Sequence, residues 1–139
     1  MRIIIVGTSH PYRGGLAAFN ERLAREYVKQ GHEVELYTFT LQYPAFLFPG
    51  KTQYSDEPKP DDLTIYREIN SVNPFNWWRV GREIKSKKPE MVVFCYWMSF
   101  MAPCFGTIAR VCKTIDTRVV ALIHNMMPHE PSLLDKIFP

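Results

Sequence analysis

Two short stretches of the sequence gather side chains that could do chemistry. The first, residues 8–15, reads Thr-Ser-His-Pro-Tyr-Arg-Gly-Gly and ends where a helix is expected to begin. No Ser, Thr, Asp or Asn stands at the N-cap of that helix, so its first N–H groups could bind a hydroxyl or an anion. Glycine is itself an acceptable N-cap, which leaves a simple tight turn as the structural alternative.

The first stretch does not match the common nucleotide-binding signatures. The pattern G-x-G-x-x-G is absent, and the next expected strand ends in Tyr37-Thr38 rather than in an acidic residue that could bind a ribose. No Gly-Lys-Ser/Thr triplet follows the glycines, so the stretch is not a P-loop either.

The second stretch, residues 124–130, reads His-Asn-Met-Met-Pro-His-Glu and follows an expected strand. A single histidine is more often structural, but two histidines, an amide and a carboxylate in one loop favour a functional site. His124 and His129 do not have the i, i+4 spacing of a helical metal-binding pair, and a third ligand is lacking nearby. We therefore expect no metal.

Three apolar runs, two alternating stretches rich in β-formers, and the helical patterns between them predict an α/β domain. Strands are expected at residues 2–7, 33–39, 63–69, 91–96 and 118–123. The first expected helix ends at Gly31 and follows from the helical spacing of Leu16, Phe19, Leu23, Tyr27 and Val28. A second helix is expected from Asn73-Pro74 to the lysines at 85–88, and a fourth after Ser132. The third is expected over residues 103–113, with an inner face formed by Phe105, Ile108, Ala109 and Cys112. This alternation predicts a Rossmann-like parallel sheet in the order 3-2-1-4-5, flanked by helices.

Ligands of such sheets bind at the carboxyl ends of the strands, so we expect Gly14, Tyr96 and His124 at one edge. The long loop at residues 42–62 is expected to be functional or mobile. Aromatic clusters occur at Tyr43, Phe46 and Phe48, at 75–78, and at Tyr96, Trp97 and Phe100. We expect most of them in the core; the alternative is stacking on a sugar or contact with a lipid surface. Residues 85–88 are expected to be a solvated helix end.

Length and composition fit one globular domain. The chain has 139 residues, of which 46% are hydrophobic, and a net charge of +3, too small to indicate a nucleic-acid partner. Its three cysteines form no CxxC pair, and their odd number indicates a reduced, cytoplasmic protein. Neither a secretory signal nor an apolar run of about 20 residues is present, so we expect a soluble protein, with peripheral membrane contact at the inner face left open.

Two motifs resemble those of a known family. The opening RIIIVG…PYRGGLAAFNERLAREYVKQGHEVELYT resembles the start of retaining glycosyltransferases of the GT-B fold, family 4 type. The segment VVALIHNMMPHEP is similar to the HN-x-x-PHE loop that follows the fifth strand in a subset of these enzymes. The resemblance spans most of the chain.

The resemblance implies roles for residues of both stretches. It implies a donor phosphate and sugar beside the double-glycine loop (Gly14, Gly15, Leu16), and a catalytic role near the transferred sugar for His124. Because the amino-terminal domain of such enzymes mainly binds the acceptor, acceptor contacts are expected from His10, Arg13, Tyr96, Trp97, Asn125, His129 and Glu130. The expected partners are a sugar or glycolipid acceptor and a nucleotide sugar, with no cofactor.

Glycosyl transfer builds charge on a leaving phosphate, and glycine N–H groups at a helix amino end can stabilise it without a metal. The family's carboxy-terminal domain, which holds the nucleotide-sugar site and a glutamate pair, has no counterpart in residues 1–139. We therefore expect one acceptor-side domain, 1–139, inactive alone, of an enzyme that builds a polysaccharide, another glycan or a glycolipid. The alternative is a non-catalytic sugar-binding or regulatory domain with the same fold.

Overall fold

The protein is a five-stranded parallel sheet with helices on both faces. The computed structural model describes residues 1–12, 15–41, 58–97 and 99–123. The strands are β1 (Arg2–Val6), β2 (Glu33–Leu41), β3 (Thr64–Asn70), β4 (Met91–Tyr96) and β5 (Arg118–Ile123), and the helices are α1 (Gly15–Lys29), α2 (Pro74–Ser86), the 3-10 turn η1 (Ser99–Met101) and α3 (Ala102–Cys112). The sheet order β3-β2-β1-β4-β5 confirms the predicted Rossmann-like architecture.

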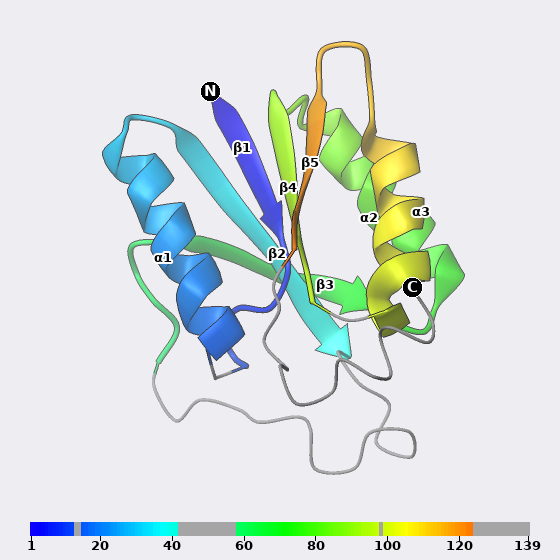
Figure 1. The fold of residues 1–139 in the computed structure, drawn as a ribbon, viewed down its shortest axis with the longest axis horizontal. Helices are drawn as coiled ribbons and strands as arrows, with labels where there is room; N and C mark the ends of the chain where they lie inside the picture. Colours follow the sequence, from blue (N-terminus) through cyan, green and yellow to red (C-terminus); the bar gives the residue numbers. More distant parts are fainter. Residues whose placement is uncertain (13–14, 42–57, 98, 124–139) are drawn as a thin grey trace.

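The helices form two layers, as the connections between parallel strands require. α1 covers one face of the sheet, and α2 and α3 lie side by side on the other (Figure 1). Right-handed crossovers place them so, because the chain moves one way along the sheet from β1 to β2 and the other way from β3 to β5. The central strand β1 is enclosed on both faces: Ile3, Ile4, Ile5 and Val6 are fully buried.

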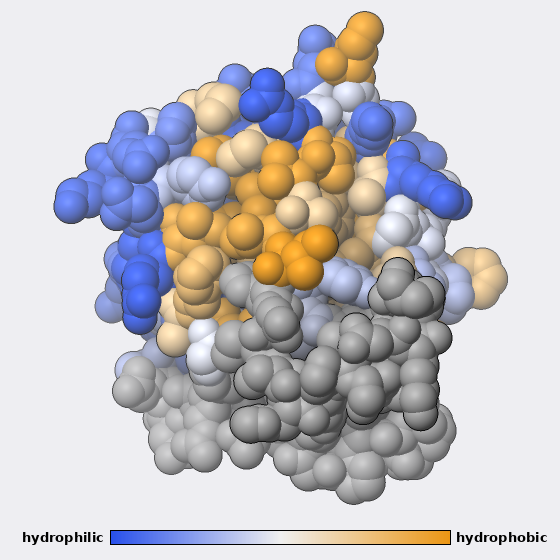
Figure 2. Space-filling view, viewed as in Figure 1, coloured by the Kyte–Doolittle hydropathy of each residue, from blue (hydrophilic) through white to orange (hydrophobic). Residues whose placement is uncertain are grey.

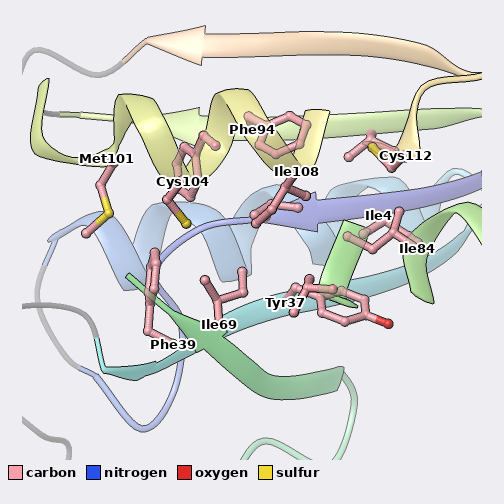
Figure 3. Packing of buried hydrophobic residues seen from close by; sticks show 14 of the residues in the cluster. Ile4, Tyr37, Phe39, Ile69, Ile84, Phe94, Met101, Cys104, Ile108 and Cys112 are labelled. Atoms are coloured by element: carbon pink, nitrogen blue, oxygen red, sulfur yellow. The ribbon is translucent and has the colours of Figure 1, made fainter. Parts of the chain in front are cut away.

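A separate apolar core lies on each face of the sheet. The larger one, under α2 and α3, includes Phe39, Phe94, Met101, Cys104 and Ile108 (Figure 3). The smaller one lies under α1 and is built around Ile3, Ile5, Ala24, Leu36 and Cys95. Burial on both faces explains why β1 and β4 are continuous apolar runs rather than alternating ones.

The signals that begin and end helices act as predicted at two positions. The Asn73 side chain caps α2 by accepting hydrogen bonds from the N–H groups of Phe75 (3.0 Å) and Asn76 (3.4 Å), and Pro74 is the first helical residue. After α1, Gly31 has a φ of +95°, a conformation that side chains disfavour, so glycine is needed where this helix stops.

Some expectations about burial were wrong. In α1 the buried residues are Ala17, Asn20 and Ala24, whereas Phe19 and Val28 are 40% and 45% exposed. Small side chains on the inner face allow α1 to lie close to the sheet, which turns these two larger side chains outward. In α2, Phe75 is 86% and Trp78 is 54% exposed, so these aromatic residues are not part of the core.

The lysine run at the end of α2 is not fully solvated either. Lys87 Nζ lies 3.1 Å from Glu35 Oε1 and 3.9 Å from the centroid of the Tyr66 ring. The ammonium group therefore ties the end of α2 to β2 and β3, and the neighbouring Lys85 and Lys88 are exposed as expected.

Apolar side chains are exposed along the edge strand β5. Figure 2 shows apolar side chains gathered over β5 and the neighbouring side of α1. Ile123 is 73% exposed, and Leu122 and Leu23 are partly buried on the α1 side. None of the helices in the described ranges combines the length and apolar character that crossing a bilayer requires. The predicted helix after Ser132 lies outside the described residues, as does most of the long loop at 42–62.

The three cysteines are free and buried, and we expect them to be unreactive in the folded protein. Burial raises the pKa of Cys95 and Cys104 to about 12 and that of Cys112 to about 11. Because the thiolate is the reactive form, labelling by a thiol reagent near pH 8 should be about a hundredfold or more slower in the native protein than in denaturant. Stopped-flow labelling with and without urea measures this; fast labelling of any cysteine in the native state would contradict it.

Candidate functional site

The carboxyl ends of β1, β4 and β5 meet at one edge of the sheet. In register, Val6 of β1 lies beside Phe94 of β4, and Tyr96 at the end of β4 lies beside Ile123 at the end of β5. α1 starts at Gly15 at the same edge, where the strands point in Figure 1. This edge is where a doubly wound sheet binds ligands, because the strand order reverses between β1 and β4.

The loop that follows β1 is held by the end of β2. Gly7 N–H donates to the Tyr37 carbonyl oxygen (3.0 Å), and Ser9 N–H donates to Thr38 Oγ1 (3.1 Å). The Tyr12 hydroxyl, 3% exposed, donates to the Phe39 carbonyl oxygen (2.9 Å). A Cβ at Gly7 would lie 2.9 Å from Cys95 Cβ, so glycine lets β1 and β4 approach closely just before the loop.

Two polar residues of α1 hold the same loop from the other side. One oxygen of Glu21, Oε2, accepts hydrogen bonds from Ser9 Oγ (3.0 Å) and from His10 N–H (2.8 Å). Asn20, 1% exposed, donates through Nδ2 to the Thr8 carbonyl oxygen (2.9 Å). These hydrogen bonds fix the backbone of residues 8–10 between α1 and β2.

Replacing Glu21 by alanine is expected to destabilise the domain by about 2 kcal/mol, because hydrogen bonds to a charged group contribute more than neutral ones and Ser9 is fully buried. Urea unfolding followed by circular dichroism measures the loss. Glu26→Ala is the matched control, since Glu26 is an exposed glutamate of the same helix whose hydrogen bond, from Gln30, is long (3.4 Å). Equal midpoints for the two variants would show that Glu21 does not hold the loop.

Tyr96 at the end of β4 and Trp97 directly after it, both predicted to contact the acceptor, lie in different surroundings. Tyr96 is partly exposed at the end of the strand, and burial raises the pKa of its hydroxyl, so the phenol stays protonated at neutral pH. Trp97 is 8% exposed and packs edge to face on Phe39 and Phe105. Its indole ring therefore helps to build the core beneath the edge, and an acceptor contact from it stays a prediction.

Of the predicted donor loop, Gly15 and Leu16 are described: Gly15 is exposed as the first residue of α1, and Leu16 packs partly against the larger core. His10 is half-buried in the loop after β1. The remaining predicted site residues lie outside the described residues: Arg13, Gly14, His124, Asn125, His129 and Glu130. Among the described side chains, no group of three or more His, Cys, Asp or Glu is placed to hold a metal ion.

Sequence reasoning missed Asn20, Glu21 and Thr38. A signal was present for Asn20: with Ala17 and Ala24 it lies on the inner face of α1, where a polar side chain needs a specific partner. Glu21 and Thr38 carry no such signal, since both residue types are common on exposed surfaces and only the fold brings them to the loop.

The fold and this edge define a Rossmann-like α/β domain with a preformed loop at the ligand-binding end of its sheet. The residue pattern of Glycosyltransferase Family 4 matches residues 13–138, which is nearly the whole chain. The chain therefore belongs to glycosyltransferase family 4, and membership implies glycosyltransferase activity with binding of a sugar donor and an acceptor. Among curated proteins, none matches this chain.

Proposed function

We propose that residues 1–139 form the acceptor-binding domain of a retaining glycosyltransferase that uses a nucleotide sugar and builds a glycan or glycolipid. The observation that carries this proposal is the family match over residues 13–138, which includes both the double-glycine loop and the loop after β5. The hydrogen bonds that hold residues 8–10 at the ligand-binding edge support it, because groups held in place lose less entropy when a ligand binds.

The donor phosphates are proposed to bind at the amino end of α1, at Gly14, Gly15 and Leu16. α1 is 15 residues long, and its first N–H groups have no partner within the helix, so its amino end attracts negative charge. As the bond to the sugar breaks, charge builds on the leaving phosphate, and fixed N–H groups stabilise it. We propose that no metal is needed for this step.

His124 is proposed to act on the transferred sugar. A neutral imidazole can hydrogen-bond a sugar hydroxyl and so orient the ring as positive charge develops in the transition state. We propose that His10, Arg13, Tyr96, Trp97, Asn125, His129 and Glu130 contact the acceptor. The half-buried His10 is supported for this role by its backbone hydrogen bond to Glu21, which fixes the residue in the loop.

We further propose that the nucleotide-sugar domain lies outside residues 1–139 and that the protein works in the cytoplasm at the inner face of a membrane. Three buried, free cysteines support a reducing compartment. The experiment that tests the function compares the full-length protein with residues 1–139 alone, each given radiolabelled nucleotide sugars with soluble glycans and lipid extracts.

Transfer by the full-length protein and none by residues 1–139 is the expected result. Turnover by residues 1–139 alone would overturn the two-domain proposal. Sugar binding by the full-length protein without any transfer would instead favour the second candidate, a non-catalytic sugar-binding domain, because binding needs only the acceptor edge.

A further inference from the structure

One side of α2 presents aromatic and cationic side chains to solvent. Phe75, Trp78, Arg82 and Lys85 follow one another at intervals of three, four and three residues, which places them along one stripe of the helix. Phe75 and Trp78 are 86% and 54% exposed, the largest values for aromatic side chains in the part of the chain that the structure describes. Large aromatic side chains that are exposed together on one side of a helix are typical of an interaction surface.

A cation of α3 joins this stripe. Arg110, together with Trp78, Arg82 and Lys85, lines an open groove of about 630 Å³ between α2 and α3, and no carboxylate lines it. The Arg82 guanidinium lies 4.9 Å from the centroid of the Trp78 ring. We call these five residues (Phe75, Trp78, Arg82, Lys85 and Arg110) the α2–α3 surface.

Carboxylates of the described residues do not neutralise the cations of the α2–α3 surface. Arg2, Arg25, Arg79 and Lys87 each form an ion pair with a carboxylate. Within the described ranges, Arg82, Lys85 and Arg110 form none. Three positive charges beside an exposed indole ring, with no carboxylate among the described residues lining the groove, make this surface attractive to an anionic partner.

We propose that the α2–α3 surface binds an anionic phospholipid bilayer, with the Phe75 and Trp78 rings at headgroup level and the three cations on lipid phosphates. Amphipathic helices that lie in a membrane interface combine these features: a cationic side and large aromatic side chains that reach the acyl boundary. Tryptophan favours this depth because its ring is apolar and its N–H is polar.

The α2–α3 surface runs along the length of α2, from Phe75 in the first turn to Lys85 in the last turn, and Arg110 lies in the last turn of α3. α2 begins with Pro74 at the carboxyl end of β3, so Phe75 lies at the same end of the sheet as the loop after β1. The proposal does not depend on sugar transfer, since it concerns binding to lipid alone and can be measured without a nucleotide sugar.

The test is sedimentation of the full chain with vesicles of phosphatidylcholine, alone or with about 30 mol% phosphatidylglycerol. We expect binding to the anionic vesicles only, weakening as salt is added. Each cation near an anionic surface contributes about a fivefold gain in affinity, so the triple variant Arg82→Gln/Lys85→Gln/Arg110→Gln should bind about a hundredfold more weakly. The matched control Arg22→Gln/Lys29→Gln/Arg118→Gln removes the same charge from exposed positions elsewhere and should bind nearly as well as the parent.

Tryptophan fluorescence tests the orientation. Trp78 is exposed, whereas Trp77 is half-buried and Trp97 is buried, so lipids brominated near the headgroup should quench mainly Trp78. Trp78→Phe keeps an aromatic ring and should still bind vesicles while losing most of the quenching. Phe75→Ser/Trp78→Ser should bind weakly even at low salt.

Equal binding to neutral vesicles, equal weakening by the control triple variant, or unchanged quenching in Trp78→Phe would each overturn the proposal. The proposal is also overturned if the α2–α3 variants leave vesicle binding intact and instead abolish self-association or binding to single-stranded RNA. A second copy of the chain or a nucleic acid would then be the partner of this surface. None of these results bears on sugar transfer.

Discussion

Replacing His124 by alanine in the full-length enzyme is expected to lower kcat by about a hundredfold or more while changing KM little, by analogy with the loss of one hydrogen-bond donor to a transition state. The reason is that the proposed contact strengthens as charge develops on the reacting sugar and adds little to ground-state binding. Steady-state kinetics with varied donor and acceptor concentrations measures the two constants. Thermal unfolding of the same preparation shows whether the variant is folded.

Gly15→Val is the companion variant for this experiment, because it should weaken binding of the nucleotide sugar rather than lower kcat. A β-branched side chain at the first residue of α1 would stand where the backbone is proposed to approach the donor phosphates. The KM for the nucleotide sugar should therefore rise, with the stability of the fold little changed. If His124→Ala leaves kcat intact, or instead lowers the melting temperature by many degrees, His124 is a structural residue.

Gly81→Ala is expected to destabilise the domain by about 1–3 kcal/mol, the usual cost of adding a methyl group to a filled core. Gly81 lies on the buried side of α2, and a Cβ there would stand 2.7 Å from Val111 Cβ and 3.3 Å from the Ile108 carbonyl oxygen. α3 would have to move outward, because part of the obstacle is its backbone. Urea or thermal unfolding measures the change, and the melting temperature should fall by several degrees.

Gly106→Ala is the matched control on α3. It makes the same substitution within a helix, but a Cβ at Gly106 meets nothing within 4 Å. Since alanine favours the helix over glycine by about 1 kcal/mol, this variant should be more stable than the parent. The two variants should thus shift stability in opposite directions, and a stabilising Gly81→Ala would show that α2 and α3 are less closely packed than described.

The fold could be predicted from the sequence because its signals are local and agree with one another. Apolar β-branched runs such as residues 91–96 coincide with a strand, and Asn73-Pro74 marks the start of α2 as expected. The strand order followed from alternating strands and helices together with the handedness of their connections. The signals for single strands and helices each lie within a few consecutive residues, so they can be recognised from the sequence alone.

Burial and the details of the loop could not be predicted in the same way. Helical spacing places Phe19 and Val28 of α1 near the inner stripe, yet the buried side of α1 is formed by the small residues Ala17, Asn20 and Ala24, and both larger side chains are exposed. Likewise Glu21 and Thr38 reach the loop after β1 only because α1 and β2 flank it in space, 11 and 29 residues away from the groups that they bind. Hydrogen bonds between residues this far apart in the sequence depend on tertiary packing, which cannot be predicted from a local sequence pattern.

The place of β1 in the sheet also affects how the nascent chain acquires its structure. β1 leaves the ribosome before the other four strands of the sheet. Ile3 has a neighbour on β2 at Val34, but its neighbour on the other side, Met91 of β4, is synthesised 57 residues after Val34. Until then one edge of β1 has unpaired N–H and C=O groups beside apolar side chains, a state that invites aggregation. The central strand of the finished sheet is thus an exposed edge while the residues between β2 and β4 are synthesised.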